Sequence, residues 1–123
     1  MIHLDTSVLI HALTGPKRSA PQLRHWIDRR ERVAISTLAL YEWLRGPRLR
    51  EEIEAQEALF PSATAISFGP SEAAVAAHLY RTLPRPRGRE LDLAVAACAL
   101  TSGATLWTLN PEDFQDIPHL RLL

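Results

Sequence analysis

The sequence predicts an α/β domain in which a parallel sheet of four to five strands is covered by helices on both faces. Short apolar segments of strand length alternate along the chain with longer segments of helical pattern, and this alternation is typical of parallel sheets. The chain has 123 residues, of which 46% are hydrophobic, so it can bury a core of ordinary size. No internal repeat and no long linker divides it, and we therefore expect residues 1–123 to form one domain.

The chain opens with a predicted strand and two predicted helices. "MIHL" (1–4) is an apolar run of strand length, and it leads directly into the helical segment "TSVLIHALTG", which stops at Gly15. Residues 19–31 predict a second helix, because their apolar residues recur on one face and Ser19 and Gln22 have the spacing of a capping box.

The middle of the chain alternates in the same way. "VAIS" (33–36) predicts a second strand, and the helix that follows it (37–46) is stopped by a Gly-Pro pair. Residues 48–60 predict a charged amphipathic helix, and "ATAISF" (63–68) predicts a third strand. Residues 70–83 predict a further helix, whose initial proline suits a first helical turn.

The last third of the chain contains the most apolar helix. After the linker "PRPRGR" (84–89), residues 90–102 predict a helix with apolar residues on every side, and such a helix is normally buried. "TLWTL" (105–109) predicts a fourth strand, and "HLRLL" (119–123) is a candidate fifth strand. Asp92 lies in the first turn of the apolar helix, and a carboxylate in that position requires an explanation.

Four acidic residues are expected at one edge of the sheet. Parallel strands with right-handed crossovers place every strand-to-helix turn at the carboxyl edge, where ligands bind in such folds. Asp5 directly follows the first predicted strand and Asp113 follows the fourth, and the helices that carry Glu42 and Asp92 begin at this same edge. If the first and fourth strands are neighbours where the strand order reverses, Asp5 and Asp113 face one crevice.

Each of these acids also has a purely structural explanation. Asp5 could cap the helix that follows it, Glu42 could be a solvated helix acid, and the helix macrodipole favours Asp92 by roughly 0.3–1 kcal/mol. Asn110 could cap a turn in which Asp113 occupies the third position. The dipole does not explain why the residues around Asp92 are apolar.

Four carboxylates in one crevice repel one another strongly. At about 5 Å and an effective dielectric constant of about 20, each pair is destabilised by roughly 3 kcal/mol, so the cluster would partly protonate unless divalent cations neutralised it. Oxygen ligands alone suit Mg²⁺ or Mn²⁺, and a cation held by carboxylates at a sheet edge is typical of sites that hydrolyse phosphodiesters. The five histidines show no metal-site spacing, so zinc is not expected.

Four segments of the chain together resemble a known family. "LDTSVLI", "YEWLRG", "DLAVAACAL" and "LWTLNPEDF" occur in the order and spacing of a PIN domain, and the chain resembles the VapC-type toxins of toxin–antitoxin pairs over essentially its whole length. The resemblance implies a PIN-like three-layer α/β/α fold. It also implies Mg²⁺- or Mn²⁺-dependent endoribonuclease activity, in which metal-activated water leaves 5′-phosphate and 3′-hydroxyl ends. The catalytic and metal-binding roles fall by resemblance on Asp5, Glu42, Asp92 and Asp113.

The resemblance further implies supporting residues and partners. Thr6 and Asn110 would support the acids, and Asp116 could take or share the role of Asp113. Members of the family commonly form homodimers and are held inactive by an antitoxin whose tail lies across the active site. An RNA substrate, a cognate antitoxin and a second copy of the chain are therefore the expected partners.

Arginines near Asp92 predict a phosphate-binding rim. The 14 basic and 14 acidic residues give a net charge of zero, which argues against binding nucleic acid over the whole surface but leaves local patches open. Arg81, Arg85, Arg87 and Arg89 lie in and beside the linker before the apolar helix, and phosphate contacts of this kind position a nucleic acid. A solvated loop explains the same residues without RNA.

Two other functions fit parts of the pattern. A PIN-like module that binds RNA or an antitoxin without cleavage would keep the fold, although the presence of all four acids argues against it. A phosphoacceptor domain of the receiver or phosphatase type also places an aspartate after its first strand. Such sites usually have a neighbouring acid and a late lysine, and here Lys17 is the only lysine.

The composition indicates a reducing compartment. Cys98, the only cysteine, can form no intrachain disulfide and lies inside an apolar run. No apolar stretch approaches the roughly 18 residues of a membrane span, and the first residues lack the basic segment of a signal peptide. We therefore expect a soluble, cytoplasmic protein with no membrane partner.

Overall fold

A computed structural model describes the whole chain, residues 1–123. The strands are β1 (Ile2–Leu4), β2 (Val33–Ala34), β3 (Thr105–Trp107) and β4 (Arg121–Leu122). The α-helices are α1 (Thr6–Leu13), α2 (Ala20–Asp28), α3 (Thr37–Arg45), α4 (Arg50–Leu59), α5 (Pro70–Thr82) and α6 (Glu90–Thr101). Two short 3₁₀ helices are η1 (Ser62–Thr64) and η2 (Pro111–Asp113).

The four strands form one parallel sheet in the order β2-β1-β3-β4. Ile2 of β1 pairs with Val33 on one side and with Thr105 on the other, and Thr105 pairs in turn with Arg121. The chain thus adds β2 on one side of β1 and β3 on the other, so the strand order reverses between β1 and β3. This parallel sheet is the one that the alternating pattern predicts.

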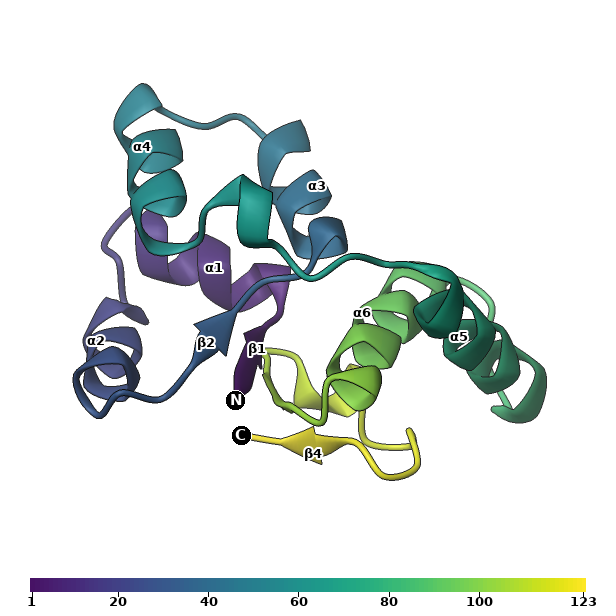
Figure 1. Cartoon of the computed structure of the whole chain (residues 1–123). Helices are drawn as coiled ribbons and strands as arrows, with labels where there is room; N and C mark the ends of the chain where they lie inside the picture. Colours follow the sequence, from purple (N-terminus) through teal and green to yellow (C-terminus); the bar gives the residue numbers. More distant parts are fainter.

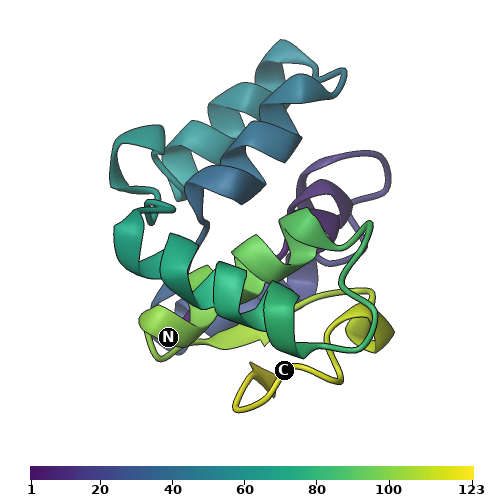
Figure 2. The ribbon, with the colours of Figure 1, turned by 90° about the vertical axis from the view of Figure 1, so that its right-hand side faces the viewer.

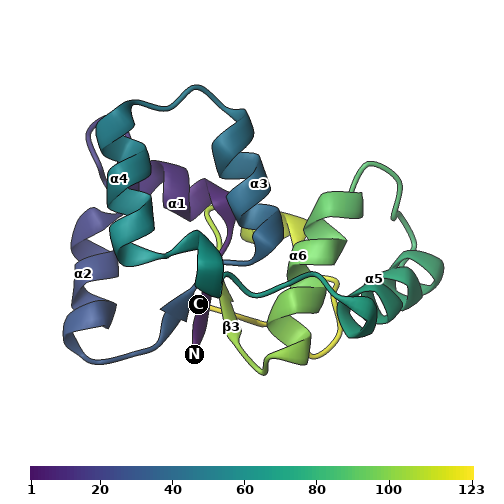
Figure 3. The ribbon, with the colours of Figure 1, turned by 45° about the horizontal axis from the view of Figure 1, so that its top comes forward.

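Helices cover both faces of the sheet. Figures 1 and 3 show α1, α2, α3 and α4 gathered on one side and α5 and α6 on the other, and Figure 2 shows α5 and α6 side by side. The side chains of β3 alternate between the two layers, because Trp107 joins the core under α1 and α3 while Leu106 joins the core under α6. The predicted three-layer α/β/α arrangement is confirmed.

The burial of α6 agrees with its composition. Every residue from Leu93 to Ala99 is buried, including Cys98. α5 covers the side of α6 that does not face the sheet, and Leu79 and Leu93 belong to one hydrophobic cluster. None of the helices, α6 included, is long and apolar enough to cross a membrane.

The predicted strand over residues 63–68 is wrong. η1 occupies its start, and only Ile66 pairs, in a single parallel bridge with Ser36. The segment that carries Ser36 turns into α3 directly after this bridge, so the pairing cannot continue. The Phe68 N–H instead donates to the hydroxyl of Thr37 at 3.1 Å. The sheet therefore has four strands, and the candidate strand at the end of the chain supplies the fourth.

Two predicted helix caps are also wrong. Ser19 makes no side-chain bond to α2, because its hydroxyl shares a 2.7 Å hydrogen bond with Nδ1 of His11. Asn110 makes no side-chain bond to η2. Ser36, for which we predicted no cap, accepts a 3.1 Å hydrogen bond from the N–H of Ala39 at the start of α3. Spacing alone does not reveal which partner in the fold competes for a hydroxyl.

Candidate active site

The carboxyl ends of β1 and β3 lie side by side where the strand order reverses. In an open parallel sheet this is the place at which ligands bind. Asp5 directly follows β1, and Asp113 lies in η2, beyond β3. The charges of Asp5, Asp113 and Glu42 all act on Asp92, so the structure brings the four predicted acids together at this edge of the sheet, in the region that we call the crevice.

Asp5 lies at the start of α1 without capping it. Its side chain is buried and makes no cap hydrogen bond to the helix. Oδ2 instead accepts hydrogen bonds from the hydroxyls of Ser7 and Thr108, each at 2.8 Å. Both donors bind the same oxygen, so Oδ1 keeps its lone pairs for another partner. Capping therefore does not explain why an aspartate occupies this position.

Glu42 is held by α1. Its Oε1 accepts a 2.9 Å hydrogen bond from the hydroxyl of Thr6, and its Oε2 lies 3.5 Å from Nη2 of Arg45. The Glu42 side chain is 20% exposed, against 51% for Arg45. Glu42 is therefore an oriented, largely covered carboxylate rather than a solvated helix acid. The resemblance implied that Thr6 supports the acids, and the acid that its hydroxyl contacts is Glu42.

The pKa of Asp92 is strongly perturbed. Partial burial in the first turn of α6 raises the pKa of its carboxyl from 3.8 to about 6, and the negative charges of Asp5, Asp113 and Glu42 add to this effect. The positive charge of Arg89 acts in the opposite direction and does not outweigh them. Perturbed carboxyl groups of this kind occur often at functional sites.

Asp113 and Asp116, the alternatives for the fourth acid, have different surroundings. The charge of Asp113 acts on Asp92, and its exposed carboxylate accepts no protein hydrogen bond. Asp116 instead accepts two hydrogen bonds from the guanidinium of Arg89, at 2.6 and 2.9 Å, and this pairing lowers the pKa of Asp116. The crevice therefore receives Asp113, while Asp116 is bound to Arg89.

Ser7 and Thr108 are site residues that we did not predict from the sequence. Besides donating to Asp5, the Ser7 hydroxyl accepts a hydrogen bond from the N–H of Leu109 and the Thr108 hydroxyl accepts one from the N–H of Asn110. Together they connect α1 to the loop after β3. Thr108 lay inside the predicted strand 105–109, whereas β3 ends at Trp107, and neither hydroxyl carries a charge to mark it as part of the site.

The donor set of the crevice fits a hard divalent cation by its chemistry. It consists of carboxylate oxygens with negative charge in excess, because Arg89, the only cation that acts on Asp92, is itself bound to Asp116. No three acidic, histidine or cysteine side chains lie close enough to hold one ion as they stand. Mutual repulsion opposes a closer approach of the acids in the absence of a cation, since at about 5 Å each pair is destabilised by roughly 3 kcal/mol.

Comparison with known proteins identifies the family. A sequence model of the PIN domain matches residues 2–120. The chain belongs to the PIN domain family. Ribonuclease VapC19 of Mycobacterium tuberculosis is 30% identical over 121 residues, which cover 96% of this PIN domain and 95% of the mycobacterial protein. Ribonuclease VapC1 of Rickettsia felis is 34% identical over 133 residues, with coverage of 98% and 92%. Within the family this PIN domain is of the VapC type.

Solved structures share the fold of this PIN domain. VapBC2 from Rickettsia felis, bound to a DNA fragment from its promoter, superposes with a TM-score of 0.78 at 23% identity and covers 100% of this chain and 98% of that one. A toxin–antitoxin complex from Klebsiella pneumoniae gives 0.75 at 23% identity, with coverage of 98% and 95%. At these identities the likeness shows the fold, and it confirms the predicted PIN-like architecture.

The arginines expected to form a rim beside the crevice fall into two groups. Arg81 lies in the last turn of α5 of the PIN domain and Arg85 and Arg87 in the following linker, and all three are exposed. The side chain of Arg89 is only 19% exposed and is bound to Asp116. Three of the four arginines can therefore meet a ligand freely, and the fourth is already engaged.

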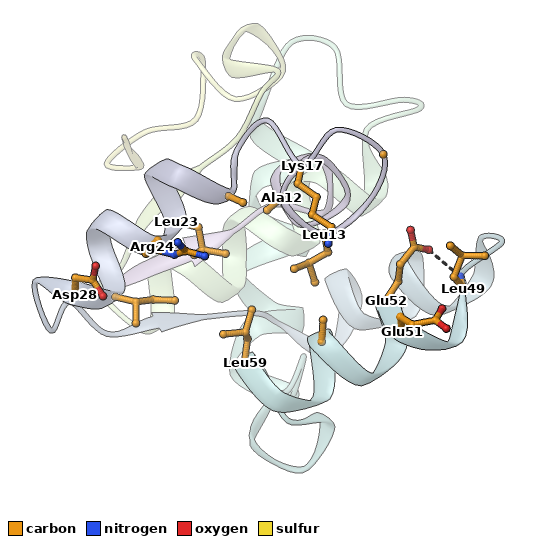
Figure 4. A pocket seen from close by; sticks show the side chains of 14 residues that line it. Ala12, Leu13, Lys17, Leu23, Arg24, Asp28, Leu49, Glu51, Glu52 and Leu59 are labelled. Atoms are coloured by element: carbon orange, nitrogen blue, oxygen red, sulfur yellow. Dashed lines mark hydrogen bonds between the residues drawn. The ribbon is translucent and has the colours of Figure 1, made fainter.

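A hollow of the PIN domain lies away from the acids. It is a groove of about 760 Å³ between α1, α2 and α4, shown in Figure 4. Leu13, Leu23 and Leu59 contribute to its apolar lining, and none of the four crevice acids borders it. The charged residues around it are Lys17, Arg24, Asp28, Glu51 and Glu52.

Proposed function

We propose that this PIN domain is a Mg²⁺- or Mn²⁺-dependent endoribonuclease. In this proposal it acts as the toxin of a toxin–antitoxin pair, with RNA, a cognate antitoxin and a second copy of itself as partners. The observation that carries the proposal is Asp92, whose carboxyl is destabilised by burial and by three neighbouring carboxylates. Such a cluster of negative charge destabilises the metal-free protein, and a divalent cation bound between the carboxylates would remove the repulsion. The VapC relatives named ribonucleases supply the substrate class.

The crevice residues have distinct parts in this proposal. Asp5 would bind the cation through Oδ1, because Ser7 and Thr108 fix its other oxygen. Glu42, oriented by Thr6, would bind from α3, with Asp92 and Asp113 completing the set. The chemistry supplied by Mg²⁺ or Mn²⁺ at such a site is activation of a water and stabilisation of the leaving oxygen of the phosphodiester.

Cleavage of RNA by the purified protein tests this function. We expect cleavage that requires Mg²⁺ or Mn²⁺, stops with chelator, leaves 5′-phosphate and 3′-hydroxyl ends, and is lost in Asp5→Asn. Glu54→Gln, which changes an exposed acid of α4 paired with Arg50, should cleave like the wild type. Binding of RNA without cleavage under any divalent metal would instead favour a non-catalytic binding module.

Arg85 and Arg87 are proposed to hold RNA phosphates near the crevice. The double change of Arg85 and Arg87 to alanine should weaken RNA binding and flatten its salt dependence, by about 0.7 in the slope of log K against log salt for each phosphate that the variant no longer neutralises. The measurement is RNA affinity across a salt series. Alanine at Arg29 and Arg30, which are exposed at the end of α2, is the matched control. An unchanged slope in the first variant would remove the rim from the proposal.

The groove between α1, α2 and α4 is proposed to receive an antitoxin segment. The solved relatives include VapBC and other toxin–antitoxin complexes. The apolar lining, with basic Lys17 and Arg24 on one side and acidic Glu51 and Glu52 on the other, suits a segment with an apolar face between charges of both signs.

A charge placed in the groove tests this docking site. Leu59 is 44% exposed and lines the groove, so Leu59→Glu should weaken antitoxin binding about 10-fold or more, equivalent to about 1.4 kcal/mol, and leave RNA cleavage intact. Leu123→Glu, with similar exposure outside the groove, should bind antitoxin normally. Equal binding by both variants would place the antitoxin elsewhere.

A further inference from the structure

Arg89 is the most highly connected cation of the molecule. It precedes α6, and its Nη1 and Nη2 donate to Oδ2 and Oδ1 of Asp116 at 2.9 and 2.6 Å. Nη2 also donates to the main-chain carbonyl of Asp113 at 3.0 Å, and Nη1 to the carbonyl of Arg85 at 3.3 Å. A planar guanidinium that uses both ends of its fork in this way has a fixed position.

These bonds join the two elements that carry the last two acids of the crevice. Arg89 belongs to the start of α6, which carries Asp92, and it binds the backbone of Asp113 in η2. The carboxylate of Asp113 has no hydrogen bond to the protein, so its own side chain does not fix it. Phe114 and Ile117 anchor the same loop in the core, but both follow Asp113 in the sequence and make no hydrogen bond that would hold its carboxylate.

Asp116 also keeps Arg89 from pairing with the acids of the crevice. A free guanidinium beside Asp92 and Asp113 would pair with their carboxylates and compete with a cation for them. The two-pronged bond to Asp116 occupies the fork and neutralises its charge. The pair thereby stays next to the crevice without entering it.

We infer that Arg89 and Asp116 form a positioning pair, which holds the backbone of Asp113 so that its carboxylate lies beside Asp92. Neither residue touches metal or RNA in this role, in contrast to the phosphate contact expected of Arg89. The inference rests on the proposed function, since it concerns the arrangement of the metal-binding acids. It gives Asp116 a place in the site without making it the fourth ligand.

Mn²⁺ binding by calorimetry tests the pair. Arg89→Gln and Asp116→Asn should each weaken Mn²⁺ binding about 10-fold or more, the usual effect of losing a group that orients a ligand. Arg89→Lys should be impaired as well, because a lysine has no fork. In RNA cleavage the loss should fall on kcat, with KM little changed. Arg29→Gln, at an exposed arginine directly after α2, should bind Mn²⁺ like the wild type.

A double variant decides whether the pair acts through Asp113. In an Asp113→Asn background, Arg89→Gln should cause no further loss of Mn²⁺ affinity; an undiminished loss overturns the inference. A raised KM with unchanged Mn²⁺ affinity overturns it too, and makes Arg89 an RNA contact. Thermal unfolding checks that each variant is folded. If Arg89→Gln does not fold, Asp116→Asn tests the inference in its place, because it changes an exposed side chain. Wild-type protein that binds no Mn²⁺ would overturn the proposed function and this inference together.

Discussion

Replacement of Asp92 by asparagine is expected to abolish RNA cleavage while making the metal-free protein more stable. Groups that merely orient a metal ligand contribute about 10–100-fold to affinity or activity, so loss of a ligand should reduce cleavage by about 100-fold or more. The variant should also lose most of the Mn²⁺ binding of the wild type. These losses follow from the place of Asp92 among Asp5, Glu42 and Asp113.

The gain in stability follows from the sign of the pKa shift. The carboxyl of Asp92 titrates at about 6 in the folded protein, against 3.8 without the fold, so the folded state prefers the protonated form. The contribution of Asp92 to the free energy of unfolding is fully present below about pH 4 and is lost as the pH rises through about 6. The whole shift corresponds to about 3 kcal/mol, and partial exposure of the group reduces the expected effect to about 2 kcal/mol. Asparagine has no charge, so the variant should keep this stability at neutral pH.

Two measurements on the same samples check this prediction. Denaturant unfolding in chelator across the pH range gives the free energy of unfolding, and calorimetry with cleavage assays gives metal binding and activity. Glu90→Gln is the matched control, because Glu90 is an exposed acid in the same first turn and interacts with the same helix dipole. If the two variants behave alike, Asp92 is a helix-end acid, and the binding-module alternative gains support.

The position of the acids could be predicted because it depends on chain direction. A strand that enters a parallel sheet leaves it at the carboxyl edge, so Asp5 and Asp113 had to lie at one edge wherever the strands were placed. The shared crevice also required β1 and β3 to be neighbours, and the structure meets this condition. Asp92 could be predicted because the apolar run after it can only be a buried helix.

The partners of the acids could not be predicted, because they depend on how elements rotate against one another. Thr6 follows Asp5 in the sequence, yet its hydroxyl reaches Glu42 on α3. Arg89 meets Asp116 across 27 positions of the sequence, so linker composition alone indicated only a phosphate contact or a solvated loop. The wrong prediction of a strand at 63–68 has a related cause, since the segment that would pair with it turns away after Ser36.

Replacement of Trp43 by alanine is expected to remove a large part of the stability of the fold. Trp43 has 0% exposure and is the largest of the fully buried side chains of the molecule. Truncation of a buried tryptophan destabilises a protein by about 3–5 kcal/mol, out of a total of about 5–15 kcal/mol. Arg48, whose guanidinium lies 4.3 Å from the centre of the indole, loses its stacking partner in the same change. Denaturant unfolding of the variant measures the loss.

Trp43→Phe separates the volume of this side chain from its polar group. The indole N–H of Trp43 is buried without a hydrogen-bond partner, and an unsatisfied buried donor is itself destabilising by about 1–3 kcal/mol. Phenylalanine removes that donor while filling most of the space, so its loss should be only about 1–2 kcal/mol. Glu42 adjoins Trp43 in α3, so the alanine variant should also cleave RNA more slowly per folded molecule, whereas the phenylalanine variant keeps the rate. Equal destabilisation by Trp43→Phe and Trp43→Ala would contradict this prediction. It would mean that the indole N–H has a hydrogen-bond partner in solution, and that the volume of the side chain does not hold α3 and Glu42 against α1.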